Sequence, residues 1–355
     1  MKSKMKALTT ALFLLGIATV SSSAFAATRF AYVADFAGNT ISAFAINPVN
    51  GTLVPLGGAC AVVPTAPGPN SLVVDPTGRF LYVANLLANQ ISLFTINSIT
   101  GCLGPGPLLG TPNPTSIRIS ANGACLYASN QAVNSVTAFS ANPVTGALAF
   151  VNLLGTPNPD GLAVDPFGQF VYVANTGPGT VSGFLSNPIN CALLAPVPGS
   201  PFGGPAGPVG VAVDPVGQFV FVTDSVANAV SSYRINPANG ALAFIAAIGT
   251  PPKPMGVSVD QFGQFLYVAN NGAANVIGFR INPAVGNLAV IGVFPVGGAP
   301  VGATVDQSGR FLYVANSGTN NVWGDIINPI PGNLINSPGT PFAAGVFPVA
   351  VATTP

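Results

Sequence analysis

Six polar side chains could bind or transform a ligand in a chain that is otherwise repetitive and largely apolar. They are Asn70, Asn113, Arg118, Asn158, Asp160 and Lys253. A guanidinium or an ammonium group can stabilise a developing oxyanion, and a carboxylate can activate a water molecule. Arg118, Asp160 and Lys253 are therefore the candidate catalytic residues, and the three asparagines can add neutral hydrogen bonds to a bound ligand.

The composition excludes several common kinds of active site. The 355 residues include no histidine, and every acidic residue is an aspartate. A Ser-His-Asp or Cys-His nucleophile is therefore impossible, as is a metal site built from cysteine and histidine. The sequence also lacks a Gly-x-Ser-x-Gly motif and a phosphate-binding Walker loop. We expect no cofactor and no bound metal.

The candidate residues are positioned by a sequence repeat of 45 to 50 residues. The segment VDPTGRFLYVAN at 74–85 recurs closely at 164–175, 213–224, 259–270 and 305–316, in degenerate form at 119–130 and truncated at 29–35. Its tyrosine position falls at Tyr32, Tyr82, Tyr127, Tyr172, Phe221, Tyr267 and Tyr313. Self-similarity at this period indicates a repeat architecture.

Each repeat contains four apolar segments separated by turn sequences. An Asp-Pro-x-Gly turn precedes the strand that ends in Tyr-Val-Ala-Asn, an Asn-x-x-x-Asn turn follows it, and Asn-Pro-x-x-Gly precedes the fourth segment. Four antiparallel strands in about 45 residues are typical of one propeller blade. We therefore predict an all-β fold, a seven-bladed β-propeller of four-stranded antiparallel blades.

The two ends of the chain support a closed ring. The first repeat lacks its first strand, and residues 348–355 align without a gap with residues 208–215. The C-terminal strand is therefore expected to complete the first blade, which removes an open sheet edge.

The repeat places the candidate residues around the central channel of the ring. The innermost strands share one position, where the residues are Val73, Arg118, Ala163, Ala212, Ser258, Thr304 and Ala352. Arg118 is the charged exception, and Asp160 enters the neighbouring blade. An unpaired buried charge is costly, which leaves two alternatives: a structural ion pair between Arg118 and Asp160, or a ligand site at the channel mouth. Asp325 takes a third-strand phenylalanine position, where we expect a substitution at the peripheral edge.

The pattern DP-x-GRFLYVAN…N-x-IS-x-F-x-INP-x-x-G-x-L resembles the lactonase-type seven-bladed β-propeller family. That family includes 6-phosphogluconolactonase-like proteins, and the pattern also resembles the YVTN-repeat exported propellers. The resemblance extends over essentially the whole chain after its N-terminal segment. It implies the propeller fold and, as one activity, lactone hydrolysis through His, Arg and Glu residues near the ring centre. Because this chain has neither His nor Glu, direct transfer of that activity is not expected.

The N-terminal 26 residues have the pattern of a secretory signal peptide. Lysines at positions 2, 4 and 6 precede an apolar run over residues 7–20, and Ala-Phe-Ala at 24–26 is a small-x-small cleavage site. The apolar run is shorter than the ~20 residues of a spanning helix, so no transmembrane anchor is expected. We predict a single domain over 27–355, exported to the periplasm, the exterior or the cell surface of a bacterium.

Export allows disulfide bonds between the cysteines, which are Cys60, Cys102, Cys125 and Cys191. Cys102 follows a turn between third and fourth strands, and Cys125 begins a second strand in the next blade, at the same end of the ring. We predict a Cys102–Cys125 bond. The alternative is that Cys125, which stands where other blades have phenylalanine, is simply a small buried apolar residue.

Two classes of function stay open. Without the signal peptide the chain has seven basic and nine acidic residues, a balance that does not favour binding to nucleic acid. The first class is a non-enzymatic binding or envelope scaffold protein, a monomeric ring that contacts a protein, a glycan or a small neutral ligand. The second is a lactone hydrolase at the channel mouth. With no His or Glu to titrate, stability is expected to change little between neutral pH and about pH 5.

Overall fold

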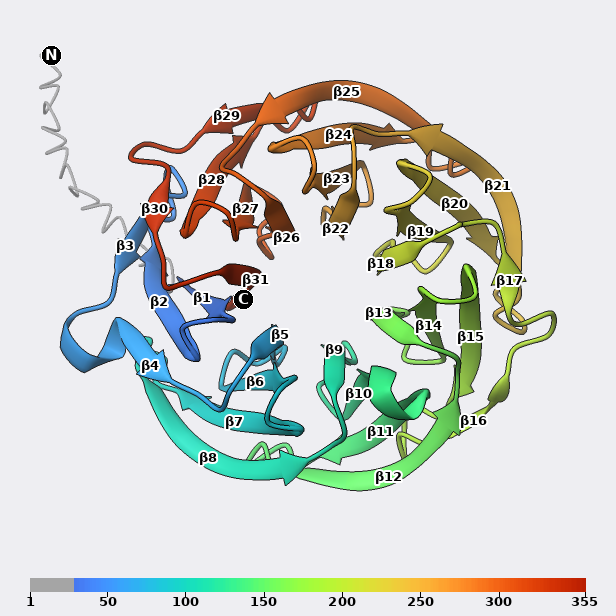
Figure 1. Cartoon of the computed structure of the whole chain (residues 1–355), viewed down its shortest axis with the longest axis horizontal. Coiled ribbons are helices and arrows are strands. Elements are labelled where there is room, and N and C mark those ends of the chain that lie inside the picture. Colours follow the sequence, from blue (N-terminus) through green and yellow to red (C-terminus); the bar gives the residue numbers. More distant parts are fainter. Residues whose placement is uncertain (1–28) are drawn as a thin grey trace, which may run out of the picture.

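The computed structural model describes residues 29–355, which form a closed ring of seven β-sheets around a central channel (Figure 1). Each sheet contains four antiparallel strands ordered from the channel to the rim, although in three sheets the outermost strand is split into two short segments. The predicted all-β fold, a seven-bladed propeller, is confirmed.

The blades are numbered one to seven along the chain, and their strands are given from the innermost outward. Blade one consists of β31 (Pro348–Thr353), β1 (Arg29–Asp35), β2 (Thr40–Ile46), and β3 (Leu53–Pro55) with β4 (Val62–Pro64). Blade two consists of β5 (Pro69–Val74), β6 (Phe80–Asn85), β7 (Gln90–Ile96) and β8 (Leu103–Gly110), and blade three of β9 (Pro114–Ile119), β10 (Cys125–Asn130), β11 (Ser135–Ala141) and β12 (Leu148–Gly155). Blade four consists of β13 (Pro159–Val164), β14 (Phe170–Asn175), β15 (Thr180–Ser186), and β16 (Leu193–Pro196) with β17 (Phe202–Gly203).

The remaining three blades follow the same order. Blade five consists of β18 (Pro208–Val213), β19 (Phe219–Asp224), β20 (Ala229–Ile235) and β21 (Leu242–Gly249), and blade six of β22 (Pro254–Val259), β23 (Phe265–Asn270), β24 (Asn275–Ile281) and β25 (Leu288–Pro295). Blade seven consists of β26 (Pro300–Val305), β27 (Phe311–Asn316), β28 (Asn321–Ile327), and β29 (Leu334–Asn336) with β30 (Phe342–Ala343). Two 3-10 turns, η1 (Gly58–Cys60) and η2 (Gln131–Val133), lie in connecting loops.

The second strand of each blade is buried between neighbouring blades, which explains its continuous apolar sequence. Every residue of β6, β14, β23 and β27 is buried. The repeat tyrosine is enclosed, and in Tyr82 its hydroxyl donates to the Gly146 carbonyl of the next blade at 2.8 Å. The equivalent bond is made by Tyr32, Tyr172, Tyr267 and Tyr313. Each of these blades is therefore joined to the next by apolar packing and by a buried hydrogen bond.

The turns divide the ring into two faces. The exit face, where the innermost strands end, carries the turns at 75–78 and 97–101 of blade two and their equivalents. The entry face carries the turns at 85–89 and their equivalents, together with the loops that lead into the innermost strands. In the exit-face turn, the Asp75 carboxylate accepts hydrogen bonds from the backbone N–H groups of Arg79 and Phe80, both at 2.7 Å. The repeated aspartate therefore stabilises the turn.

The C-terminal strand closes the ring as predicted. β31 pairs antiparallel with β1, and Tyr32 lies opposite Ala352 in the ladder. The N–H group of Thr354 then donates to the Phe30 carbonyl at 2.9 Å. The first blade is thus built from both ends of the described chain, and its first-strand edge is covered.

Both disulfides join adjacent blades, and neither is the predicted one. Cys60 bonds to Cys102, and Cys125 bonds to Cys191, so the predicted Cys102–Cys125 bond is wrong. The turn between third and fourth strands packs against the preceding blade, not the following one, because Gly101 lies directly against Phe30. Cys102 therefore faces blade one, where Cys60 lies.

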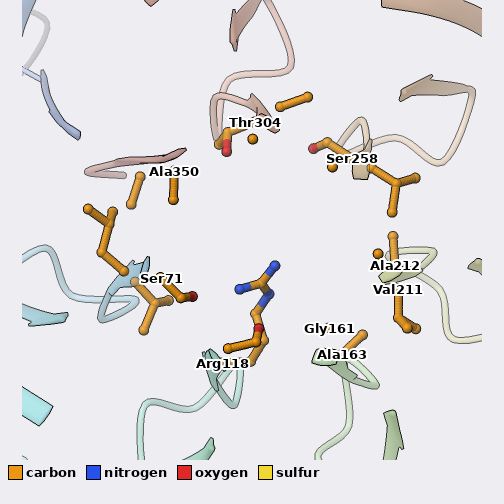
Figure 2. A pocket seen from close by; sticks show the side chains of 18 of the residues that line it. Ser71, Arg118, Gly161, Ala163, Val211, Ala212, Ser258, Thr304 and Ala350 are labelled. Carbon is orange, nitrogen blue, oxygen red and sulfur yellow. The ribbon is translucent and has the colours of Figure 1, made fainter. Parts of the chain in front are cut away.

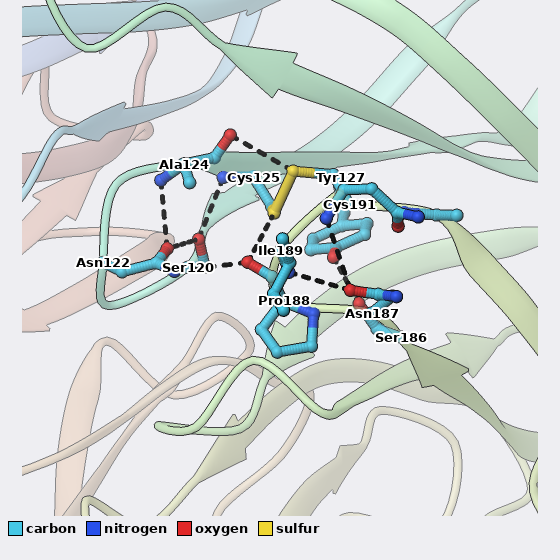
Figure 3. The surroundings of a disulfide bond; sticks show 12 residues. Ser120, Asn122, Ala124, Cys125, Tyr127, Ser186, Asn187, Pro188, Ile189 and Cys191 are labelled. Carbon is cyan, nitrogen blue, oxygen red and sulfur yellow. Dashed lines mark hydrogen bonds between the residues drawn. A yellow bond between two sulfur atoms is a disulfide. The ribbon is translucent and has the colours of Figure 1, made fainter.

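The bond between Cys125 and Cys191 replaces a contact that the other six blade interfaces share (Figure 3). At those interfaces the phenylalanine that begins a second strand packs on a glycine of the next blade's turn. The pairs are Phe30–Gly101, Phe80–Gly146, Phe170–Gly240, Phe219–Gly286, Phe265–Gly332 and Phe311–Gly51. Cys125 takes the phenylalanine position and Cys191 the glycine position, so this interface has a covalent bond in place of ring packing. Cys125 is buried, but it is not a free thiol.

The predicted signal peptide, residues 1–26, lies outside the described residues. Within 29–355, no helix is long and apolar enough to span a lipid bilayer. Export and its destination stay predictions from the sequence.

Candidate functional site

The innermost strands of all seven blades enclose a central cavity of about 700 Å³. Small and aliphatic side chains make up most of its wall, and the hydroxyl groups in the wall include those of Ser71, Ser258 and Thr304 (Figure 2). Among the described residues that line the cavity, the charged ones are Arg118 and Asp160. The cavity is therefore a chamber with a mostly neutral wall that carries one guanidinium and one carboxyl group.

Arg118 extends its guanidinium from β9 into the open part of the cavity (Figure 2). Its Nη1 donates to the adjacent Ile117 carbonyl at 2.8 Å, and no other hydrogen bond of this side chain is present among residues 29–355. Burial lowers the pKa of Arg118, but a guanidinium stays protonated in proteins at neutral pH. The cavity thus contains a fixed positive charge with several free N–H donors.

The first of the two alternatives, an ion pair between Arg118 and Asp160, is wrong. Within residues 29–355 the ion pair that forms joins Arg29 to Asp306 at 2.6 Å. Asp160 is the second residue of β13, whereas Arg118 is the fifth residue of β9. Because the innermost strands run in the same direction along the channel, this offset separates the two backbone positions by roughly 10 Å along the axis.

Asp160 lines the part of the cavity nearer the entry face. Burial raises the pKa of its carboxyl to about 6, and the nearby Thr176 hydroxyl opposes part of this shift. Its backbone carbonyl accepts a hydrogen bond from the Ser129 hydroxyl at 2.5 Å, which holds β13 against β10. At neutral pH most of the Asp160 population is ionised, and at mildly acidic pH the group can carry a proton.

Asn70 lines the same cavity, but its amide is already engaged. Its Nδ2 donates to the Thr115 carbonyl at 2.7 Å and thereby ties β5 to β9. Asn70 is therefore available to a ligand mainly through its side-chain oxygen.

Asn113, Asn158 and Lys253 lie in the entry-face loops, outside the cavity wall. Each precedes the proline that begins an innermost strand, and each has a positive φ, at 46°, 49° and 58°. Their backbone N–H groups donate to side-chain oxygens of the preceding turn, which belong to Asn89, Asn134 and Asn228. These three candidates are turn residues, so the structure brings together Arg118, Asp160 and Asn70 and separates the other half of the predicted set.

Sequence reasoning missed the cavity hydroxyls as site residues. The Ser258 hydroxyl accepts a hydrogen bond from the Val305 N–H group at 3.0 Å, which leaves its own proton free to be donated. The Thr304 hydroxyl donates to the Val351 carbonyl at 2.7 Å. A signal was present, because Ser258 and Thr304 occupy the same position of the repeat as Arg118.

Asp325 is a second charged residue that breaks the repeat, and it does not belong to the cavity. It lies on β28 opposite Leu312, and it is only 1% exposed, so the expected peripheral edge position is wrong. One carboxyl oxygen accepts a hydrogen bond from Trp323 Nε1 at 3.3 Å, whereas Oδ2 has no partner among the described residues. Burial raises the pKa of this carboxyl to about 7.

Comparison with known families gives a match over most of the chain. The family described as lactonase, 7-bladed beta-propeller, matches residues 18–115, 105–197 and 251–339. The chain belongs to this lactonase family. The resemblance found in the repeat motif is thus confirmed. No curated protein matches the sequence.

Several solved structures share the fold of this chain at low sequence identity. A protein from Bacteroides uniformis, assigned provisionally as a 6-phosphogluconolactonase, matches with a TM-score of 0.80 and 21% identity over 92% of this chain and 99% of the other. A protein from Bacteroides fragilis with the same provisional assignment gives 0.80 and 20% over 94% and 99%. The periplasmic gluconolactonase of Pseudomonas aeruginosa gives 0.78 and 20% over 92% and 99%. At these identities the likeness shows the propeller fold alone.

Proposed function

We propose that the central cavity binds a lactone, or the hydroxy acid to which a lactone opens, through the guanidinium of Arg118. The observation that carries this proposal is a fixed positive charge in a cavity of about 700 Å³, with free N–H donors and no carboxylate partner among residues 29–355. Hydrogen bonds from a guanidinium to a carboxylate are roughly twice as strong as neutral ones. Membership of the lactonase family supports this class of ligand.

The rest of the wall suits a small polyhydroxylated ligand. Ser258 can donate a hydrogen bond, Asn70 can accept one, and the remaining wall is small and neutral. A single guanidinium can pair with one carboxylate, whereas a doubly charged phosphate ester would add excess negative charge to a partly buried cavity that already contains the Asp160 carboxyl. The proposed ligand is therefore an unphosphorylated sugar lactone or sugar acid.

Hydrolysis of the bound lactone is the second candidate function, and the observation that favours it is the Asp160 carboxyl in the same cavity. In its ionised form Asp160 would take a proton from a water molecule as that water attacks the lactone carbonyl carbon. Arg118 would stabilise the oxyanion that forms. The ring C–O bond then breaks, and the ring oxygen receives the proton held by Asp160. Because both groups act on the same carbonyl carbon, the Arg118 side chain must span the offset of roughly 10 Å along the axis between the two backbone positions.

Binding can be measured by isothermal titration calorimetry with gluconate as the stable product of lactone opening. Arg118→Leu should weaken binding about 10- to 100-fold, the expected effect of removing a charge-assisted hydrogen bond. Lys253→Leu removes a positive charge outside the cavity and is the matched control, which should bind like the unchanged protein. Equal affinity of the Arg118→Leu variant would refute the proposal.

Hydrolysis requires a separate assay, in which gluconolactone opening is followed by titration and corrected for the spontaneous rate. If Asp160 is the base, the enzymatic rate should rise with pH through about 6, and Asp160→Asn should remove it while leaving gluconate binding intact. Binding without turnover would support the non-enzymatic alternative. An envelope scaffold role receives no support from the cavity itself.

A further inference from the structure

The exit face carries a ring of exposed apolar side chains. In five of the seven blades the turn between the third and fourth strands places one at its tip, and these are Val49, Ile99, Val144, Ile189 and Ile330, each 75–90% exposed. The turns between first and second strands of blades four, five and six add Phe167, Val216 and Phe262, each 57–64% exposed. We call these eight residues the exit-face ring. Because the turns of all blades lie at one end of the propeller, a flat partner can contact the ring simultaneously.

The exposed side-chain charge on this face is positive. Arg79, Arg234, Arg280 and Arg310 are exposed, and each lies over a phenylalanine ring at 4.9–5.4 Å. Each also donates to a turn carbonyl of the next blade, as Arg310 does to Pro48 at 2.8 Å. The guanidiniums are thereby fixed beside the exit-face ring, and their remaining N–H groups stay accessible.

The aspartates of the same face do not offset this charge at the surface. The turn carboxylates are Asp75, Asp165, Asp214, Asp260 and Asp306, and every one is at most 5% exposed. Their oxygens accept backbone N–H groups, as in Asp75, or pair with Arg29. A partner that approaches the exit face therefore meets guanidiniums and apolar tips, but no exposed carboxylate from these turns.

The direction in which the chain enters the fold adds a second, independent argument. β1 begins at Arg29, at the exit-face end of blade one, because Phe30 contacts the exit-face turn at Gly101. In the sequence, residues 21–28 connect Arg29 to the apolar run over 7–20. In a precursor whose signal peptide is still held by the membrane, the chain would thus be tethered at the exit-face end of blade one.

We propose that the exit face docks on a lipid bilayer that contains anionic headgroups. Guanidiniums attract lipid phosphates, and aliphatic and aromatic tips enter the boundary between headgroups and acyl chains. A second copy of the chain is a poor partner, because face-to-face contact would set the arginines of both copies against each other. A bilayer matches a planar ring of tips around the whole propeller better than the surface of a single globular protein does.

The test is sedimentation of residues 27–355, the predicted secreted form, with vesicles. This form is suitable because residues 29–355 contain all seven blades of the ring. Vesicles of mixed phosphatidylcholine and phosphatidylglycerol should bind the protein, and phosphatidylcholine alone should bind it weakly. Replacing each of the four arginines with glutamine should weaken binding about fivefold, and replacing all four several hundredfold. The fourfold change to lysine keeps the charge and should retain most of the binding.

Serine substitutions at exposed tips test the apolar half of the proposal without disturbing the core. Ile189→Ser, Ile330→Ser and Phe262→Ser together should greatly reduce binding while the melting temperature stays unchanged, because none of the three side chains is buried. The matched control is on the entry face, where Leu87→Ser, Val226→Ser and Lys253→Gln should leave binding intact.

Three outcomes would overturn the proposal. Binding that is independent of phosphatidylglycerol, or equal losses from entry-face and exit-face substitutions, would remove the role of this face. Binding of soluble polyglutamate with the same arginine dependence, in the absence of vesicle binding, would identify an acidic protein as the partner instead.

Discussion

Replacing Asp325 with leucine should stabilise the protein, most strongly above pH 7. The side chain is 1% exposed, its Oδ2 lacks a partner among the described residues, and five of the six other blades carry phenylalanine at this position. Burial raises the pKa of the carboxyl from its ordinary 3.8 to about 7. A shift of this size corresponds to a cost of ~4 kcal/mol for keeping the group ionised in the folded protein.

The pH dependence follows from the sign of this shift. Below the unfolded-state pKa of about 4 the carboxyl is neutral in both states and carries no ionisation cost. The cost grows as pH rises from about 4 and is complete above the folded-state pKa of about 7. The buried Asp35, whose pKa is also raised to about 6, contributes in the same direction. Stability should therefore rise as pH falls from 8 to 5, in contrast to the small change expected from the sequence alone.

Thermal melts at pH 8 and pH 5 give the measurement. For a chain of this size, ~4 kcal/mol corresponds to a melting-temperature gain of ~6 °C in Asp325→Leu at pH 8. At pH 5 the gain should shrink to roughly a third, because the remaining cost is that of protonating a carboxyl about one pH unit above its unfolded-state pKa. Asp35→Asn serves as a second probe of the same linkage. If Asp325→Leu lowered the melting temperature equally at both pH values, the carboxyl would have to be partnered, and the reasoning would fail.

Three further outcomes are expected. Deleting residues 348–355 should cause aggregation or a large fall in melting temperature, because β1 loses its inner partner β31 and keeps only β2; an unchanged melting curve would contradict the closed ring. Cys191→Gly alone should cost about 2–5 kcal/mol, whereas the double change with Cys125→Phe should recover much of the loss by restoring the contact of the other six interfaces; calorimetry of single and double variants tests this. Arg118→Leu should keep or raise the melting temperature, and its effect should add to that of Asp160→Asn within ~0.5 kcal/mol, since no ion pair joins them. A larger coupling energy would show that the two side chains interact.

The disulfides show what repeat alignment could have found. Cys125 stands in the one blade that lacks the phenylalanine, and Cys191 stands in the one blade that lacks the turn glycine. Both exceptions are visible in the sequence. Pairing them requires knowing that each turn packs on the preceding blade. That direction follows from the handedness of the ring, which a single repeat does not specify. The predicted partner of Cys125 therefore lies in the preceding blade, whereas the actual partner lies in the following one.

The candidate site divides in the same way. The position of Arg118 in the repeat predicts that its side chain points from an innermost strand into the channel. The same alignment gives the mostly small residues at the equivalent position of the other blades. Whether Asp160 could reach it depended on the axial level of each residue. The sequence places Asn113, Asn158 and Lys253 just before the innermost strands and therefore near the site. In the structure they adopt positive φ values and stabilise the entry-face loops.

The sequence by itself determined the strand pattern, the number of blades and the closure of the ring, because these depend on local turn chemistry and on apolar periodicity that repeats along the chain. Only the tertiary structure decided which exceptions to the repeat meet. Arg118 stays unpaired in the cavity, Asp325 is sealed inside blade seven, and Cys125 bonds to Cys191, because contact between blades depends on axial height, packing direction and enclosure. These three properties are set when seven sheets are arranged around one axis, and a linear repeat does not specify them.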